Sequence, residues 1–181
     1  KKFKATNRST IIKIFMPGYE LIDKKEFLAI KKIFDNGGIL FAHGFEKIRK
    51  NFHVREFENS TKKFFKSNYA LAVSSGTAAI KIGLKALGVK KGDEVITQAF
   101  NFIATIEAIL DCGAKPVLVN VDKTLNMDIN ELKKKITKKT KAIIPVHMLG
   151  YPCDMNSIKR ISREKKIKIL EDNCESVGGT Y

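Results

Sequence analysis

Small and hydroxyl-bearing residues fill the segment Ser74–Ala78, which reads Ser-Ser-Gly-Thr-Ala. It separates an apolar run, Tyr69–Val73, from a run of helical periodicity that continues to Leu87. A turn of small residues between a strand and a helix lets backbone N–H groups converge on an anion, and the helix N-terminus adds its partial positive charge. The segment therefore suits a phosphate group. Helix capping is the alternative explanation, because Ser, Gly and Thr are ordinary capping residues.

Two further groups of residues that could take part in binding or catalysis follow later apolar runs. The segment Gln98–Phe102 contains two aromatic residues, of which Phe102 is better suited than Phe100 to stack on a ring. Asp172 lies in an acidic segment after the last apolar run and can pair with a protonated ring nitrogen, because a carboxylate favours the charged ring. Together with a phosphate seat, these groups suit a phosphorylated aromatic cofactor. An Asp against a pyridinium nitrogen is what makes pyridoxal phosphate an electron sink.

The elements that must position these groups alternate from residue 69 onward. Five apolar runs predict strands, at Tyr69–Val73, Glu94–Thr97, Pro116–Val121, Lys141–Val146 and Ile167–Leu170. Helical periodicity lies between them, at Thr77–Leu87, Phe102–Asp111, Ile129–Ile136 and Met155–Lys165. This alternation predicts an α/β fold with a parallel sheet covered by helices on both faces. Ligands bind such sheets at the carboxyl ends of the strands, so the three candidate groups are expected to share one edge.

The first part of the chain has a different pattern. Helices are predicted at Ile22–Phe34 and Val54–Phe65, with Phe57, Phe64 and Phe65 facing inward. We therefore expect residues 1–68 to form an arm with helices and residues 69–181 to form the sheet domain.

Composition excludes several classes of protein. The net charge of +15 comes almost entirely from Lys and is spread along the chain, without the interleaved aromatic residues of a nucleic-acid-binding motif. No apolar run approaches the ~20 residues of a membrane span, and the basic residues 1–14 lack the apolar region of a signal peptide. Three scattered cysteines predict a reducing, cytoplasmic compartment and buried structural thiols. No spacing of Cys and His resembles a metal site.

Each candidate residue has a simpler explanation beside the functional one. Asp172 can be a helix cap or a surface acid, and Phe102 can belong to the core. His147 ends the fourth predicted strand on the same edge, where a substrate contact and a structural role are equally open. Glu171 should point away from Asp172 by strand alternation, and we treat it as structural.

Several segments resemble the DegT/DnrJ/StrS family of sugar-nucleotide aminotransferases. The matching stretches are SSGTAAIKIGLKALGVKKGDEVIT (74–97), QAFNFIATIEAIL (98–110), TKAIIPVHMLGYPCDM (140–155) and ILEDNCESVGGTY (169–181), and EFENSTKKFFKSNYALAV (56–73) fits as well. The resemblance implies the pyridoxal-phosphate-dependent transferase fold of aspartate-aminotransferase type I. In that fold, residues 69–181 correspond to the N-terminal half of the large cofactor-binding domain. Family members ordinarily work as homodimers.

The resemblance also implies roles for individual residues. Thr77 and Ala78 fall on the positions that bind the cofactor phosphate, with Gly76 allowing the close turn. Phe102 falls on the ring-stacking position, and Asp172 on the partner of the pyridine nitrogen. A second set consists of Glu175, which stands where Gln more often bonds the cofactor's phenolic oxygen, and His147 and His43, which are weak candidates for substrate contacts. The family's Schiff-base lysine lies in a segment resembling SFxxxKxxxxGEGG, which we expect beyond Tyr181.

Three functional hypotheses follow. The first is an aminotransferase that moves an amino group, from glutamate, to a keto-sugar nucleotide in polysaccharide biosynthesis. The second is a dehydratase of the same family, which uses the aminated cofactor and carries His in place of the lysine. The third is an inactive, truncated basic protein with acidic partners. We expect these 181 residues alone to bind the cofactor weakly and to catalyse no transamination.

Overall fold

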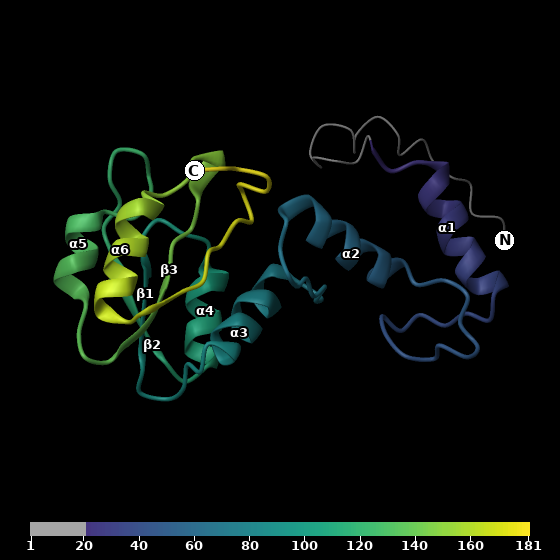
Figure 1. The fold of residues 1–181 in the computed structure, drawn as a ribbon, viewed down its shortest axis with the longest axis horizontal. Coiled ribbons are helices and arrows are strands. Elements are labelled where there is room, and N and C mark those ends of the chain that lie inside the picture. Colours follow the sequence, from purple (N-terminus) through teal and green to yellow (C-terminus); the bar gives the residue numbers. More distant parts are fainter. Residues whose placement is uncertain (1–20) are drawn as a thin grey trace, which may run out of the picture. The chain divides into compact units, whose positions relative to one another are not determined.

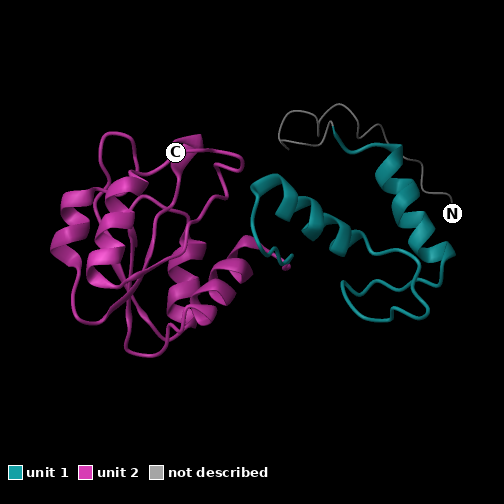
Figure 2. Ribbon diagram, viewed as in Figure 1, with its two compact units in different colours: residues 1–72 teal, residues 73–181 magenta. Residues whose placement is uncertain are grey.

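The computed structural model describes residues 21–181 and divides the chain into two compact units. Figure 2 colours the first unit, residues 1–72, and the second, residues 73–181. The basic segment 1–14 lies outside the described residues. The candidate site belongs to the second unit.

The first unit contains helices α1 (Lys24–Asp35) and α2 (His53–Phe65), which agree with the two predicted helices. A capping box begins α1, because the Asp23 carboxylate accepts from the Lys25 N–H and Glu26 accepts from the Asp23 N–H. The prediction that the phenylalanines of α2 face inward is wrong, since Phe57 and Phe64 are 63% and 71% exposed. Within residues 21–72 no second apolar layer covers them.

The second unit contains one four-stranded sheet with all strands parallel. Its strands are β1 (Glu94–Gln98), β2 (Lys115–Val119), β3 (Thr140–Ile144) and β4 (Lys168–Ile169), in the order β2-β1-β3-β4. Four of the five predicted strands are thereby confirmed. The prediction of a strand at Tyr69–Val73 is wrong: the segment forms no regular secondary structure and pairs with no strand among the described residues, and Tyr69 is 89% exposed. An apolar run becomes a strand only where a neighbouring strand accepts its hydrogen bonds.

Helices connect the strands and begin at residues with polar side chains. The second unit contains α3 (Gly76–Ala86), α4 (Ile103–Asp111), α5 (Ile129–Lys135) and α6 (Met155–Lys165) (Figure 1). Ser75, Asp128 and Asp154 cap α3, α5 and α6, each accepting backbone N–H groups of the first turn. Every helix within residues 21–181 is too short or too polar to cross a bilayer.

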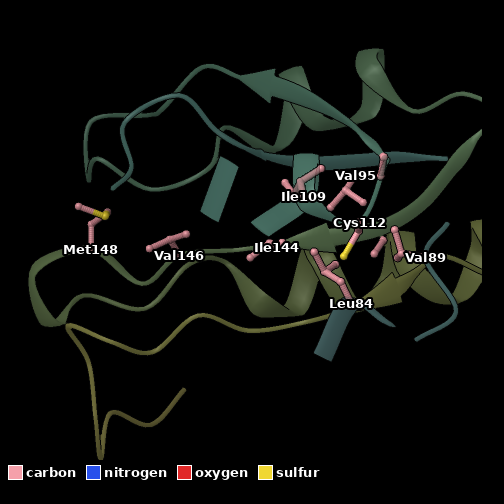
Figure 3. Packing of buried hydrophobic residues seen from close by; sticks show 10 residues of the cluster. Leu84, Val89, Val95, Ile109, Cys112, Ile144, Val146 and Met148 are labelled. Atoms are coloured by element: carbon pink, nitrogen blue, oxygen red, sulfur yellow. The ribbon is translucent and has the colours of Figure 1, made fainter. Parts of the chain in front are cut away.

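Apolar side chains of the sheet pack on both of its faces. Val95 of β1 and Ile144 of β3 belong to a core cluster with Leu84 of α3 and Ile109 of α4 (Figure 3). The adjacent residues of the same strands, Ile96 and Ile143, belong to a second cluster with Leu132 of α5 and Ile158 of α6. Because successive strand residues point to opposite faces, the sheet is covered on both sides as predicted.

The cysteines differ in their surroundings. Cys112 and Cys153 are buried in the two core clusters, as expected, and all three thiols are free. The expectation of a buried thiol is wrong for Cys174, which is exposed because it lies in the turn that follows Asp172.

Candidate functional site at the carboxyl edge of the sheet

A pocket of about 200 Å³ lies at the carboxyl edge of the sheet. Four predicted site residues line it together, although they come from three separate segments of the chain. Its complete lining consists of Gly76, Thr77, Ile80, Phe102, Ala104, Thr105, Asp172 and Cys174. The parallel topology produces this meeting, since α3, α4 and the segment after β4 all begin or pass at the same edge.

The N-terminus of α3 combines the two roles considered for its sequence. Ser75 caps the helix, with its Oγ accepting from the Ala78 N–H at 3.1 Å. The N–H groups of Gly76 and Thr77 have no acceptor among the described residues, and both residues line the pocket. Ala78 does not line it. The turn is therefore capped and still presents two free donors to an anion.

Phe102 stands at the start of α4 as its N-cap residue and is 73% exposed. Its extended backbone places the side chain before the helix rather than on the helix face that packs in the core. Phe100 is 47% exposed and is not part of the pocket lining. The aromatic ring at the pocket is that of Phe102.

Asp172 extends the pairing of β3 with β4 by one further bridge. Its N–H donates to the Pro145 carbonyl at 3.0 Å, and its carbonyl accepts from the His147 N–H at 3.1 Å. The carboxylate is half-buried and accepts two hydrogen bonds, from the Cys174 N–H to Oδ1 at 3.2 Å and from the Thr105 hydroxyl to Oδ2 at 3.2 Å. Backbone and side chain are both held in place at the pocket.

Glu171 contacts a different set of side chains from Asp172. It accepts from the Tyr181 hydroxyl at 3.1 Å and lies 3.2 Å from Nε2 of His147. It lines a separate small hollow of about 40 Å³ with these two residues. The alternation predicted for the two neighbouring carboxylates is therefore present.

His147 is 2% exposed, and both of its ring nitrogens have partners. Nδ1 accepts from the Cys153 N–H at 3.0 Å, which leaves Nε2 to donate to Glu171. It does not line the candidate pocket. The geometry favours the structural alternative for this residue.

The remaining predicted residues also lie outside the pocket lining. Glu175 Oε2 accepts from the Leu149 N–H at 2.9 Å, which ties it to the short 3₁₀ turn η3 (Met148–Gly150). His43 belongs to the first unit, where its Nε2 lies 3.5 Å from Oε1 of Glu58.

Four residues of the lining were not predicted from the sequence: the apolar Ile80 and Ala104, and Thr105 and Cys174, which carry polar groups. Thr105 follows Asn101 by four residues, and this polar spacing at the start of an apolar helix is the pattern that points to it. Cys174 lies two residues after Asp172, so it is carried to the pocket by the same turn. No cluster of three potential metal ligands occurs within residues 21–181.

Three larger hollows, of about 460, 450 and 380 Å³, lie around α5 and α6 and at the start of β2. Their linings are dominated by aliphatic and lysine side chains such as Ile136, Lys133 and Lys165. They hold no aromatic ring and no residue of the carboxyl edge. We therefore place the site at the smaller pocket, where donors, a ring and a carboxylate meet.

The thiol of Cys174 should react slowly with alkylating reagents. Its partial burial, the hydrogen bond to Asp172 and the nearby carboxylates of Asp172 and Glu175 raise its pKa from 9.0 to about 11. Below that pH the thiol stays protonated, and only the thiolate attacks. We expect its rate with iodoacetamide to rise with a midpoint near pH 11. At pH 8 the thiolate fraction is about a hundredfold below that at the ordinary pKa, and the greater nucleophilicity of the more basic thiolate offsets this about tenfold, so the rate should be roughly tenfold below that of the unfolded chain.

The control for this measurement is Glu175→Gln, which removes one negative charge beside the thiol. It should lower the pKa and speed alkylation at pH 8, as followed by mass spectrometry of the peptide that contains Cys174. Equal rates for the folded and the unfolded chain at pH 8 would contradict the expectation.

The fold and the pocket together define a class of protein: an α/β domain that presents a helix N-terminus, an aromatic ring and a carboxylate at one strand edge. The chain belongs to the DegT/DnrJ/EryC1/StrS aminotransferase family, whose family model matches residues 42–181. The resemblance drawn from the sequence motifs is thereby confirmed. So is the fold class, because the similar solved structures have the pyridoxal-phosphate-dependent aminotransferase fold.

Individual relatives give the scale of the similarity. GDP-perosamine synthase of Escherichia coli O157:H7 is 39% identical over 133 residues, which cover 73% of this chain and 36% of that protein. GDP-4-keto-6-deoxy-D-mannose 3-dehydratase of Yersinia pseudotuberculosis is 39% identical over 163 residues, which cover 86% of this chain and 39% of that protein. The crystal structure of NtdA from Bacillus subtilis with bound cofactor PMP has a TM-score of 0.78 and 36% identity, covering 92% of this chain and 37% of that one. The chain thus spans less than half the length of these relatives.

Proposed function

We propose that the complete protein is a pyridoxal 5'-phosphate-dependent aminotransferase acting on a keto-sugar nucleotide. It moves the amino group of glutamate to the keto carbon, yielding the amino sugar and 2-oxoglutarate. The observation that carries the proposal is the meeting of Gly76, Thr77, Phe102 and Asp172 around one pocket. Family membership and the aminotransferases among its relatives support it. We further propose a homodimer that works in the cytoplasm.

The pocket lining fits the parts of this cofactor. The free N–H groups of Gly76 and Thr77 suit the phosphate, and the exposed ring of Phe102 suits stacking on the pyridine. The Asp172 carboxylate suits the pyridine nitrogen. When bound, the cofactor supplies an electron sink for bond cleavage at the amino-acid carbon.

The protein's own residues then have distinct tasks. Asp172 holds a proton on the ring nitrogen, Phe102 fixes the plane of the ring, and the start of α3 anchors the phosphate, with Ala78 one residue further along that helix. Glu175 is proposed to form a hydrogen bond with the phenolic oxygen of the cofactor. For this, Glu175 must either release the hydrogen bond that it accepts from the Leu149 N–H or share a proton with the phenolic oxygen. The buried ring of His147 is proposed to affect substrate binding only indirectly, because it accepts a hydrogen bond from Cys153 and so positions the turn at that residue.

A dehydratase of the same family is the second candidate. The observation that favours it is the match to the 3-dehydratase of Yersinia pseudotuberculosis, which covers 86% of this chain against 73% for the perosamine synthase. The residue at the family's lysine position, which we expect beyond Tyr181, separates the two: Lys for amino transfer and His for dehydration. With glutamate and a keto-sugar nucleotide, the dehydratase would replace one hydroxyl group of the sugar by hydrogen. Glutamate would supply the two electrons and leave as 2-oxoglutarate, and its nitrogen would leave as ammonia.

The decisive experiment is cofactor binding followed by product analysis with the complete protein. We expect a visible absorbance band on addition of pyridoxal phosphate and much weaker binding of pyridoxal, which lacks the phosphate. Addition of glutamate should then form the amino form of the cofactor and 2-oxoglutarate. A complete protein that takes up no pyridoxal phosphate at millimolar concentration would overturn the proposal.

A further inference from the structure

A chain of polar side chains, whose first and last members are buried, runs from the sheet to the Asp172 carboxylate at the pocket. Thr97 of β1 donates from Oγ1 to the Ile144 carbonyl of β3 at 3.0 Å. Asn101 donates from Nδ2 to Thr97 Oγ1 at 3.2 Å. Thr97 and Thr105 are 0% and 1% exposed, so the chain is anchored in the sheet and shielded from water. Three residues spaced by four in sequence thus lie in line between the β3 backbone and the pocket.

Thr105 is the last member of this chain and the one that contacts the carboxylate. Its Oγ1 lies 3.2 Å from Asp172 Oδ2 and 3.3 Å from Asn101 Oδ1. A hydroxyl group has one proton to donate, and a charged acceptor makes the stronger hydrogen bond. The proton of Thr105 therefore goes to Asp172, with the Asn101 oxygen beside it.

The carboxylate of Asp172 is consequently held on both oxygens. Oδ1 accepts from the Cys174 N–H, a contact made within its own turn, while Oδ2 accepts from a helix that is 67 residues away in sequence. The contact from α4 is the one that fixes the carboxylate relative to Phe102, because Phe102 caps the same helix. One helix start therefore sets both the ring-stacking residue and the orientation of the carboxylate.

We propose that Thr105 is a positioning residue that orients the Asp172 carboxylate toward the pyridine nitrogen of the cofactor. This inference rests on the proposed function, because it gives the carboxylate its partner. Without the hydroxyl, Asp172 must find its orientation from one hydrogen bond and from the cofactor itself. Part of the binding free energy of the cofactor is then used to fix the Asp172 side chain, which Thr105 otherwise holds in place before the cofactor binds.

Two substitutions at this position separate the hydroxyl group from packing. Thr105→Val keeps the shape and removes the hydroxyl, while Thr105→Ser keeps the hydroxyl and removes a methyl group. In the complete protein, we expect T105V to bind pyridoxal phosphate about tenfold more weakly, with an altered pH dependence of the absorbance of the bound cofactor. T105S should keep the affinity and the spectrum of the wild type to within about threefold.

The outcomes are distinct. Weak binding by T105V with normal binding by T105S supports the proposal, and thermal unfolding shows whether each variant is folded. Normal affinity and spectrum for T105V, while D172N is impaired, would overturn the positioning role but leave the proposed function intact. Impairment of T105S with normal T105V would overturn it too, because packing rather than the hydroxyl would then matter. A wild-type protein that binds no pyridoxal phosphate would overturn the proposed function itself.

Discussion

Asp172→Asn in the complete protein is expected to lower kcat/KM for amino transfer by about a thousandfold. The substitution keeps the size of the side chain and removes its charge. A carboxylate about 4 Å from a protonated ring nitrogen stabilises it by about 4 kcal/mol at an effective dielectric constant of 20, which corresponds to that factor in rate. The measurement is the steady-state rate of 2-oxoglutarate release, together with the affinity for pyridoxal phosphate.

Glu171→Gln is the matched control for this prediction. It removes the same charge from the preceding residue, whose carboxylate contacts Tyr181 and His147 instead of the pocket. We expect E171Q to retain activity to within about threefold. Similar losses in both variants would show that the net charge of the segment, rather than the place of Asp172, determines the rate.

The sheet could be predicted from sequence because its central strands are apolar on both faces. Val95 and Ile96 of β1 enter opposite core clusters, as do Ile144 and Ile143 of β3. A strand of this kind reads as a continuous apolar run and needs no knowledge of its neighbours. Tyr69–Val73 reads the same way, but its backbone has no paired strand within the described residues, and pairing is a property of the fold rather than of the segment.

The candidate site was partly predictable for a related reason. Ligands bind a parallel sheet at the carboxyl ends of its strands, and the order of elements along the chain is enough to bring Phe102, after β1, and Asp172, after β4, together. Gly76 joins them although the segment before α3 is not a strand. The same rule places His147 at this edge. It cannot tell that the ring turns inward, because that depends on the turn at Cys153, whose N–H donates to the ring.

The signal for Thr105 in the sequence is limited to its spacing of four residues from Asn101, for a different physical reason. A threonine near the start of an apolar helix is ordinary, and its importance comes from one hydrogen bond to a residue 67 positions away. The apolar faces of α1 and α2 show the opposite case. Periodicity correctly predicts the helices, but the exposed Phe57 and Phe64 show that an apolar face does not specify what covers it.

Asn126→Ala is expected to destabilise the second unit by about 3 kcal/mol. Asn126 is 2% exposed and joins two turns, with Oδ1 accepting from the Met148 N–H at 3.1 Å and Nδ2 donating to the Tyr151 carbonyl at 3.0 Å. The substitution leaves both backbone groups without partners. A buried polar group that loses its hydrogen bond costs about 1–3 kcal/mol. The Met148 N–H is buried, and the Tyr151 carbonyl, which is partly buried, adds a smaller cost.

The substitution should also loosen the support of Glu175. The turn that Asn126 holds includes Leu149, whose N–H donates to the Glu175 carboxylate at 2.9 Å. We therefore expect faster hydrogen exchange at the amides of Met148 and Leu149 in N126A, before global unfolding is reached. Exchange at Ile96, in the centre of β1, should change only by the amount of the global destabilisation.

Asn120→Ala is the control, because Asn120 is exposed and its side chain makes no hydrogen bond with the described residues. The free energy of unfolding of N120A, measured by urea denaturation, should remain within about 0.5 kcal/mol of that of the wild type. For N126A, the denaturation midpoint should fall at an unchanged slope, since the surface exposed on unfolding is nearly the same. Equal stability of the two variants would contradict the prediction, because the hydrogen bonds of Asn126 would then not hold the two turns together. The position of Leu149 next to Glu175 would in that case depend on the backbone of the turn alone.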